Sequence, residues 1–385
     1  MSTSISAPEL NPERGFLSLQ DPLRHLPAAF DAWESVALSL PKLFASDRLR
    51  RAISELPPFP ADAIATDAER ERAMVVLSYL GHAYVWGGPI PANTLPERIA
   101  VPWHNIARSL GRPPVLSYSS YALHNFFRFD PAREIECGNI ALIQNFLGGI
   151  DEEWFILIHV EIERLAAPAM ASLNACLDAA DSSDAERLEH LLRDVHFSIE
   201  SMLATLKRMP EWCDPYVYYH RVRPYIHGWK NHPDLPQGIF YEGVKAYRGE
   251  PQQFRGETGA QSAIVPSLDA MLGIGHQEDV LRTYLMEMRT YMPPAHRRFI
   301  ESLEARGSVL PLIEKAARSR LTEVYDACVD ALEQFRSQHL EYAAAYIFRQ
   351  AQTDRKNPHA VGTGGTPFMQ YLKKHRDETG LHKFE

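Results

Sequence analysis

The sequence predicts an all-α fold, and three observations support this prediction. Apolar residues recur every three to four positions through much of the chain, which is the spacing of an amphipathic helix. The alternation of apolar and polar residues that marks a half-buried strand is nearly absent. Neither an internal repeat nor a low-complexity tract interrupts these patterns, so we expect an ordinary folded protein built from packed helices.

Residues 1–148 predict a smaller domain of short helices. Prolines punctuate residues 1–66, and proline ends a helix because it lacks the N–H that continues the hydrogen-bonded ladder. From Asp67 the pattern becomes helical, with Asp67 as the capping residue, acidic residues in the first turn and a glycine pair at the end. A short helix and an apolar segment follow, in TLPERIAVPWHNIARSLG and PPVLSYSSYALHNFFRF. The pair Gly148-Gly149 loosens the backbone, so we expect the domain boundary there.

Residues 149–385 predict a larger domain of longer helices. Clear helical spacing marks residues 152–176, 184–209, 262–275, 277–292, 294–306, 317–350 and 367–378. Residues 210–262 are rich in glycine, proline, tyrosine and charge, and they predict a long ordered loop region, which in a compact domain is often functional. Residues 351–366 are polar and glycine-rich, and they predict a mobile loop.

Composition and charge argue against several classes of function. The net charge of −9 lacks the basic excess of a nucleic-acid-binding protein. No run of about 18 apolar residues predicts a membrane span, and the first residues lack a basic and apolar signal sequence. The four cysteines have no CxxC spacing, so we expect a reducing, cytoplasmic environment and no structural zinc. The sixteen histidines leave open whether any of them binds a metal.

A histidine interrupts the apolar face of the segment 317–350. That face consists of Leu321, Tyr325, Cys328, Leu332 and Phe335, and it continues in Ala343 and Tyr346. His339 takes the intervening position, and small alanines leave space beside it. A buried imidazole needs a hydrogen bond or a metal, because its nitrogens are costly to bury alone. A single histidine with room for a flat macrocycle suits a heme, whereas periodicity alone favours a core histidine bonded to a carbonyl.

A second histidine, His159, lies within the segment 152–176. The buried face expected for this helix consists of Phe155, Ile158, Ile162 and Ala166. His159 is adjacent to that face, while Glu161, Glu163 and Arg164 are expected on the polar side. Its imidazole could therefore contact the ligand of a heme from the distal side, or be a partly buried structural histidine.

Two further segments carry residues suited to binding a small polar ligand. The segment CDPYVYYHRVRPYIHGWKNHP combines four tyrosines with Arg221 and Arg223, which suits an aromatic amino acid because a guanidinium can bind a carboxylate through two parallel bonds. A solvated basic segment with aromatic anchors is the more common alternative. The glycine-rich GTGGT at residues 362–366 could close over an anion or a polar ligand, or serve as a flexible linker, and it lacks the Walker pattern.

Several motifs together resemble the indoleamine 2,3-dioxygenase family of heme proteins. They are RPPVLSYSSYALHNF, GWKNHPDLPQGIFYEGV, FRGETGAQS, LDAMLGIGH, MRTYMPPAHRRFIESLE, VYDACVDALEQFRSQHLEYAAAYI and GTGGTPFMQYLKKHR, and they follow the family's order over residues 112–376. The resemblance implies an all-helical fold in which residues 1–148 cover the distal heme pocket and residues 149–385 form the heme-binding catalytic domain. The N-terminal third, with GFLSLQDPLRHLP, is similar to the family more loosely.

The resemblance implies heme b (iron protoporphyrin IX) as the cofactor, ferrous in the active form, with O2 as the co-substrate. His339, in FRSQH, matches the family's proximal iron ligand. Arg336 matches an arginine that lies near a heme propionate, and Asp269, in LDAMLGI, matches the acidic residue that pairs with this arginine. Such a pair would hold the charged edge of the heme and orient the proximal helix.

On the substrate side, the resemblance implies that Arg223 binds the substrate carboxylate. Tyr218 and Tyr219 occupy positions where mammalian members carry phenylalanines that pack on the indole ring. The other implied contacts are Tyr118 and Tyr121 in the distal pocket, Gly259 beside the heme edge and Thr363 in the loop that closes on the substrate.

The implied reaction inserts both atoms of O2 across the indole C2–C3 bond of L-tryptophan or a close analogue and gives N-formylkynurenine, with an external reductant keeping the iron ferrous. His159 stands where mammalian members carry a serine, so the chain resembles a bacterial-type member with a distal histidine. In this it is similar to tryptophan 2,3-dioxygenase, a related heme family, whose distal histidine bonds the indole N–H. Glu257 stands where a glycine is usual. These polar departures keep two alternatives open: a heme oxygenase acting on a modified indole in a biosynthetic pathway, and a non-catalytic heme- or O2-binding protein.

Overall fold

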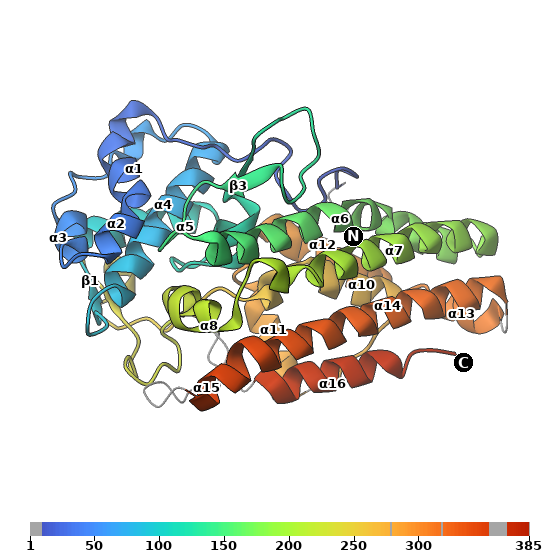
Figure 1. Ribbon diagram of the computed structural model, residues 1–385. Helices are drawn as coiled ribbons and strands as arrows, with labels where there is room; N and C mark the ends of the chain where they lie inside the picture. Colours follow the sequence, from blue (N-terminus) through green and yellow to red (C-terminus); the bar gives the residue numbers. More distant parts are fainter. Residues whose placement is uncertain (1–9, 278, 317–318, 354–367, 385) are drawn as a thin grey trace.

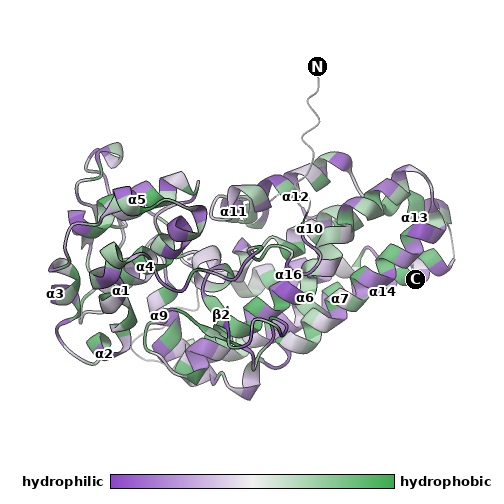
Figure 2. Cartoon of the chain, turned by 90° about the horizontal axis from the view of Figure 1, so that it is seen from above, coloured by the Kyte–Doolittle hydropathy of each residue, from purple (hydrophilic) through white to green (hydrophobic). Residues whose placement is uncertain are grey.

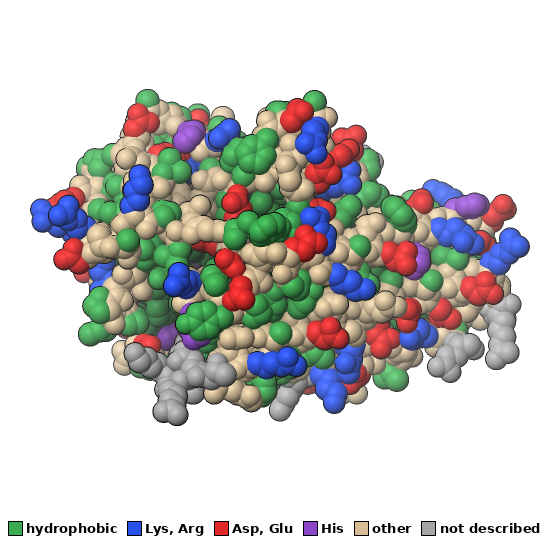
Figure 3. Space-filling view, viewed as in Figure 1, with side chains coloured by type: hydrophobic (Ala, Val, Ile, Leu, Met, Phe, Trp, Pro, Cys, Tyr) green, Lys and Arg blue, Asp and Glu red, His purple; other side chains and the backbone are tan. Residues whose placement is uncertain are grey.

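The computed structural model describes residues 10–277, 279–316, 319–353 and 368–384, and the described chain is mostly helical, which confirms the all-α prediction. Shorter helices gather at one end of the molecule, and long helices lie side by side at the other (Figure 1). No helix in these described ranges is long and apolar enough to cross a membrane. Figure 3 shows acidic and basic side chains interspersed over one face of the molecule.

The N-terminal part of the chain packs short helices around one longer helix. These helices are α1 (Asp31–Leu38), α2 (Leu40–Phe44), α3 (Leu49–Ser54), α4 (Asp67–Trp86) and α5 (Glu97–Ser109). The predicted cap of α4 is wrong by one residue, because Thr66 rather than Asp67 is the N-cap. The hydroxyl of Thr66 accepts a hydrogen bond from the backbone N–H of Glu69 (3.2 Å), and the Glu69 carboxylate accepts one from the backbone N–H of Thr66 (2.8 Å). This reciprocal capping box fixes the start of the helix.

Four strands of two or three residues are present in the described chain, in agreement with the near absence of strand patterns. They are β1 (Thr94–Leu95), β2 (Phe126–Arg128), β3 (Ile140–Leu142) and β4 (Phe240–Tyr241). Strands β2 and β3 pair antiparallel, with Phe127 opposite Ala141. Strand β1 pairs in parallel with β4, which comes from the second half of the chain. The segment around β4 is therefore folded back against the N-terminal helices.

Long helices that lie side by side dominate the C-terminal part (Figure 1). They are α6 (Ile150–Asp181), α7 (Ala185–Leu206), α14 (Arg320–Ala343) and α16 (Phe368–Gly380). Helix α7 packs against both α6 and α14, and α16 packs against α14 (Figure 1). Shorter helices complete this part: α8 (Pro215–Val217), α9 (Arg223–Ile226), α10 (Ile264–Leu272), α11 (Val280–Arg289), α12 (Pro294–Arg306), α13 (Leu310–Ala316) and α15 (Arg349–Thr353). Figure 2 shows that the long helices carry both apolar and polar residues, as amphipathic helices do.

Among the residues that the structure describes, three helical turns are of the wider π type, which is often found at functional sites. They are η3 (Ser119–Leu123), η5 (Tyr218–Val222) and η8 (Ala344–Phe348). The prediction of one continuous α-helix over 317–350 is therefore wrong at its end, because α14 stops at Ala343 and the chain continues through η8 into α15. Periodicity could not find this change, since a π turn differs from an α turn by one residue.

The described residues form two hydrophobic cores. The first surrounds α4 and contains Trp33, Tyr79 and Trp103, and the second lies among α6, α7, α10, α12 and α14. The domain boundary at residue 148 stays a prediction. The first core also contains residues that follow that boundary, among them Trp229 and Ile239.

Candidate functional site

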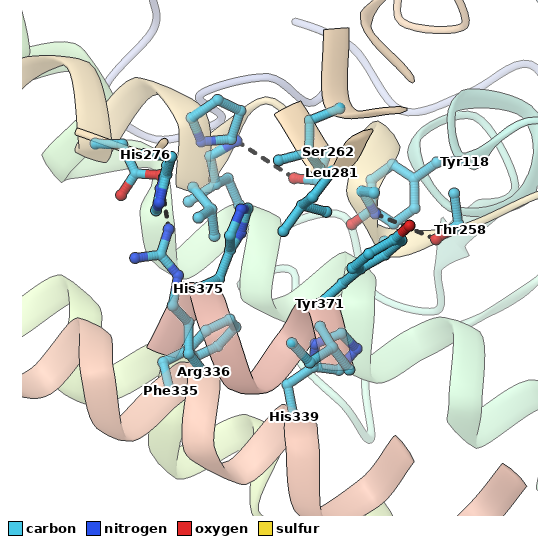
Figure 4. Close-up of a pocket in the computed structure, with 18 of the residues that line it drawn as sticks. Tyr118, Thr258, Ser262, His276, Leu281, Phe335, Arg336, His339, Tyr371 and His375 are labelled. Carbon is cyan, nitrogen blue, oxygen red and sulfur yellow. Dashed lines mark hydrogen bonds and ion pairs between the residues drawn. The ribbon is translucent and has the colours of Figure 1, made fainter. Parts of the chain in front are cut away.

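A cavity of about 630 Å³ lies in the C-terminal part of the molecule. Helices α6, α10, α11 and α14 and the segment 257–262 supply much of its lining, and α16 adds residues that include Tyr371 and His375 (Figure 4). Most of its lining surface is apolar, but tyrosine, histidine and charged residues make up more than a third of the residues that line it. A volume of about 300–1,000 Å³ with a few convergent polar groups is typical of a site for a cofactor or a small ligand.

The imidazole of His339 projects from α14 into this cavity (Figure 4). The accessible surface of its side chain faces the cavity, and the ring makes no hydrogen bond to the described residues. Burial within the protein, with a smaller contribution from the nearby His159, lowers the pKa of His339 to about 4. The ring is therefore neutral near pH 7 and can offer a nitrogen lone pair to a metal, as an axial heme ligand must. The alternative was a core histidine that donates to a carbonyl oxygen. Among the described residues, His339 makes no hydrogen bond of this kind.

His159 lines the same cavity from helix α6. Its Nδ1 lies 2.7 Å from the backbone oxygen of Phe155, so Nδ1 carries the hydrogen and donates it to this carbonyl. Burial lowers the pKa of His159 below that of a free histidine. In this neutral form Nε2 is a hydrogen-bond acceptor, and it makes no hydrogen bond to the described residues. The sequence thus located a second cavity histidine, and the structure assigns its tautomer.

Behind His159, the structure reveals a buried acid that the sequence analysis missed. The prediction that Glu161 and Glu163 face the polar side is wrong, because both are buried. Glu163 accepts hydrogen bonds from the hydroxyls of Tyr118 (2.9 Å) and Ser262 (2.8 Å), and both of these residues line the cavity. Burial raises the pKa of Glu163 to about 7. Helical spacing could not show this burial, because the two hydroxyls come from distant segments of the chain. Their hydrogen bonds offset the cost of burying the carboxyl group.

One edge of the cavity is charged. Arg336 donates to the carboxylate of Asp269 (2.6 Å) and to the hydroxyl of Thr379, and both Arg336 and Asp269 line the cavity. The ion pair that the resemblance implies is therefore present. Arg336 and the flanking His276 hold the pKa of Asp269 below its ordinary value even though burial opposes this.

Of the tyrosines and the arginine implied in substrate binding, all are buried, but only some line the cavity. Tyr118 and Tyr218 line the cavity, whereas Tyr121, Tyr219 and Arg223 do not. Arg223 is 2% exposed, and its guanidinium lies 5.3 Å from the centre of the Tyr219 ring. Tyr219, in the π turn η5, and Arg223, at the start of α9, are both buried. That these side chains contact a ligand stays a prediction.

Segment 257–262 forms the wall between the cavity and the N-terminal part. Gly259 lines the cavity, and so does Glu257, whose pKa burial raises to about 8. The segment is held by a crossing of two chain stretches at Gly228 and Gly256, which lie in two of the motifs that carry the resemblance. Thr363, expected in a closing loop, lies outside the described residues.

Comparisons with known proteins match almost the whole chain. A sequence profile described as indoleamine 2,3-dioxygenase matches residues 4–382. Human indoleamine 2,3-dioxygenase 2 is 33% identical over 389 residues, which cover 98% of this chain and 94% of the human protein. Rat indoleamine 2,3-dioxygenase 1 is 34% identical over 94% of this chain and 91% of its own length. A 6-hydroxytryptophan 2,3-dioxygenase from Fusarium equiseti is 31% identical over 98% of this chain and 97% of its own length.

Proposed function

The chain belongs to the indoleamine 2,3-dioxygenase family, and from this premise we propose that it uses heme b and O2 to cleave the indole C2–C3 bond of L-tryptophan or a close analogue, giving N-formylkynurenine. The observation that carries this proposal is the pair of cavity histidines. His339 on α14 and His159 on α6 line one cavity, and each has a ring nitrogen that no described residue engages. One can bind iron, and the other can contact the bound substrate.

The residues around the cavity fit a heme. His339 is a neutral donor on an otherwise largely apolar wall, and Phe335 lines the cavity one turn before it. Arg336 lies at the charged edge, where a propionate would find a guanidinium already fixed by Asp269. We assign His339 as the iron ligand, and Arg336 with Asp269 as the group that holds the propionate edge. Ferrous heme bound in this way supplies the binding and activation of O2.

The protein's own contribution is to hold the indole and exclude water. In the proposed complex, Nε2 of His159 accepts a hydrogen bond from the indole N–H, because Nδ1 is already committed to Phe155. Tyr118 packs edge-on against His159 with ring centres 6.0 Å apart, and Glu163 fixes the Tyr118 hydroxyl. This chain of contacts restricts the imidazole to one orientation. Fixing the indole in place of a random encounter lowers the entropic part of the barrier.

A modified indole is the second candidate substrate, and the polarity of the cavity favours it. Tyr118, Tyr218 and Glu257 all line the cavity, and with a pKa of about 8 Glu257 is mainly protonated at neutral pH. A protonated carboxyl can both donate to and accept from a substrate hydroxyl. One relative acts on 6-hydroxytryptophan by its name, so a hydroxylated tryptophan belongs in any substrate screen.

The proposal is tested by reducing the purified protein without oxygen and recording spectra with and without L-tryptophan, L-6-hydroxytryptophan or L-5-hydroxytryptophan. Oxygen is then admitted and the product mass is measured. We expect a spectral change on adding the true substrate, and a product that has gained both oxygen atoms. A gain of one atom identifies the monooxygenase alternative. A stable oxygen complex that ignores every indole identifies the non-catalytic alternative.

Replacing His159 tests its role as an acceptor for the indole N–H. We expect His159→Ala to retain heme and to lower kcat/KM about 2- to 10-fold, the effect of losing one neutral hydrogen bond, and His159→Gln to recover part of the loss. An indole analogue methylated on the ring nitrogen should be insensitive to both substitutions. Because the pKa of His159 is lowered, the ring stays a neutral acceptor at pH values below the ordinary histidine pKa. The difference in kcat/KM between the wild type and His159→Ala should therefore disappear only at more acidic pH. Equal loss for the methylated analogue would contradict this role.

The carboxylate-binding role implied for Arg223 remains part of the proposal, although Arg223 does not line the cavity in this conformation. We expect Arg223→Lys to raise the KM for L-tryptophan about 10- to 100-fold, because lysine keeps the charge but not the planar fork, and to affect tryptamine, which has no carboxylate, far less. Arg221→Lys is the matched control, because Arg221 is exposed two residues earlier. Equal effects on the two substrates would remove Arg223 from this role.

A further inference from the structure

Four side chains, His276, His375, Glu378 and Asp269, converge at the charged edge of the cavity. Of these, only Asp269 has a role in the proposed heme site. His276 follows α10, and His375 and Glu378 lie one turn apart on α16. One ligand atom from each of His276, His375 and Glu378 lies within 4.8 Å of those of the other two. Asp269, at the end of α10, contacts His276 from the other side. Figure 4 shows His276, His375 and Arg336 directed toward the same part of the cavity.

His276 is held between two carboxylates. Its Nδ1 lies 2.8 Å from Oε2 of Glu378, and its Nε2 lies 3.2 Å from Oδ2 of Asp269. Asp269 is in turn fixed by Arg336. A histidine that binds a metal through one nitrogen usually donates its other N–H to a carboxylate, which sets the tautomer and the ring orientation. Asp269 is therefore already placed to support His276 as a ligand through Nδ1.

His375 supplies the observation that points to a ligand. Its Nε2 is buried and has no hydrogen-bond partner among the described residues. Its ring stacks on that of His276, with centres 4.1 Å apart and planes inclined by 16°. Leaving a buried nitrogen without a hydrogen bond is unfavourable, because the atom has lost its water and gained no partner. Oε1 of Glu378 also lacks a hydrogen bond, and its nearest cation is Lys374, 3.5 Å away. Nε2 of His375 and Oε1 of Glu378 are thus two neighbouring Lewis-basic atoms without a hydrogen bond among the described residues.

We propose that His276, His375 and Glu378 form a binding site for a divalent transition-metal ion of the zinc class, separate from the iron ligand His339. Two imidazoles and one carboxylate are a donor set that suits Zn²⁺, with a fourth position left for water. The ion replaces the hydrogen on Nδ1 of His276, which leaves as a proton, and it converts the present contact with Glu378 into two coordinate bonds. The two stacked rings must fan apart slightly, and His375 can do so because its Nε2 gives up no bond.

An ion at this site would tie the C-terminal helix to the segment that follows α10. These two parts already meet through an ion pair between Lys374 and Asp279 and through the backbone N–H of Gly275, which donates to His382 (3.2 Å). Metal coordination would add a stronger link and would fix the α16 wall of the cavity, from which Tyr371 and His375 reach the interior. The proposal does not depend on the identity of the indole substrate or on turnover.

The experiment uses the untagged, heme-loaded protein from which exchangeable divalent metal ions have been removed by a chelator. Zinc is titrated into it by calorimetry, and zinc and iron are measured separately by elemental analysis after desalting. We expect about one zinc per chain in the wild type. His375→Phe preserves the ring stack but removes the ligand nitrogen, and Glu378→Gln preserves the shape but removes the charge. Each should weaken zinc binding at least ten-fold, and Asp269→Asn should weaken it about 10- to 100-fold.

His196→Ala is the matched control, because His196 and Glu200 form a surface pair 3.7 Å apart on α7, and this variant should bind zinc as the wild type does. His339→Ala should lose iron but keep zinc, which separates this site from the heme proposal. Circular dichroism establishes that each variant is folded. The proposal is overturned if the wild type binds no zinc at micromolar concentration, or if His375→Phe and Glu378→Gln, both folded, bind it as tightly as the wild type.

Discussion

Replacing His339 with alanine is expected to give a folded protein that has lost its heme and its Soret band. The wild-type ring is neutral, faces the cavity and makes no hydrogen bond within the described chain, so its removal deletes the iron ligand while breaking no structural contact of that side chain. The substitution leaves a space on an exposed cavity wall rather than a void in the packed core, so the cost to stability should be small compared with a core truncation of about 2–5 kcal/mol.

The measurements are the heme content of the purified variant, its spectrum and its thermal unfolding. Added imidazole should enter the space and restore part of the Soret band, since it supplies the missing nitrogen without the covalent link. His159→Ala is the matched control and should keep its heme. A His339→Ala protein that purifies with full heme and an unchanged spectrum would remove His339 from the iron-ligand role and leave His159 as the first residue to examine.

Replacing Gly256 with alanine is expected to destabilise the protein by more than about 3 kcal/mol, the upper part of the range for overpacking. A methyl group on Gly256 would overlap the backbone N–H of Gly228 and the carbonyl of Ile226. These are backbone atoms, so no side chain can move aside to relieve the clash. Separating the two stretches would break the hydrogen bonds from Glu257 N–H to Ile226 (3.1 Å) and from Trp229 N–H to Phe254 (3.0 Å).

Soluble yield and the midpoint of urea unfolding measure this effect. Gly228→Ala should behave in the same way, because the overlap is reciprocal. Gly275→Ala is the control, since a methyl group there meets no atom within 4 Å. If Gly256→Ala unfolds at the same urea concentration as the wild type, the two stretches must separate at little cost, and the crossing would not hold segment 257–262 in place.

Sequence periodicity predicted the helices of this fold well where one face of each helix is buried. The apolar stripe of α14 is a clear example: Leu321, Tyr325, Cys328 and Leu332 are all buried, as their spacing requires. Periodicity failed for α13, which it did not find, and at the end of α14, where the chain widens into η8. A helix of seven residues and a one-residue change of turn are both too short to leave a periodic signal.

Within the candidate site, the sequence located the histidines better than the acids. His339 and His159 each stood on or beside an apolar face, so a position facing the interior followed from spacing, and both line the cavity. Glu163 also lies on a buried face, but its charge suggested solvent, and its partners Tyr118 and Ser262 come from remote segments. Spacing also could not predict that Arg223 does not line the cavity. Its position follows the π turn η5, and such a turn leaves no regular repeat in the sequence.

Residues after Gly228 pack into the first hydrophobic core, so this core cannot be completed until more than half of the chain has been synthesised. Trp229, Ile239 and Tyr241 complete a core whose other members are largely encoded before residue 148. The N-terminal helices therefore leave the ribosome long before the side chains that cover them. Domains usually fold as they are synthesised, N-terminal first. Here the first core has to wait with part of its apolar surface open, so the nascent chain during that interval is the stage at which chaperone binding would matter most.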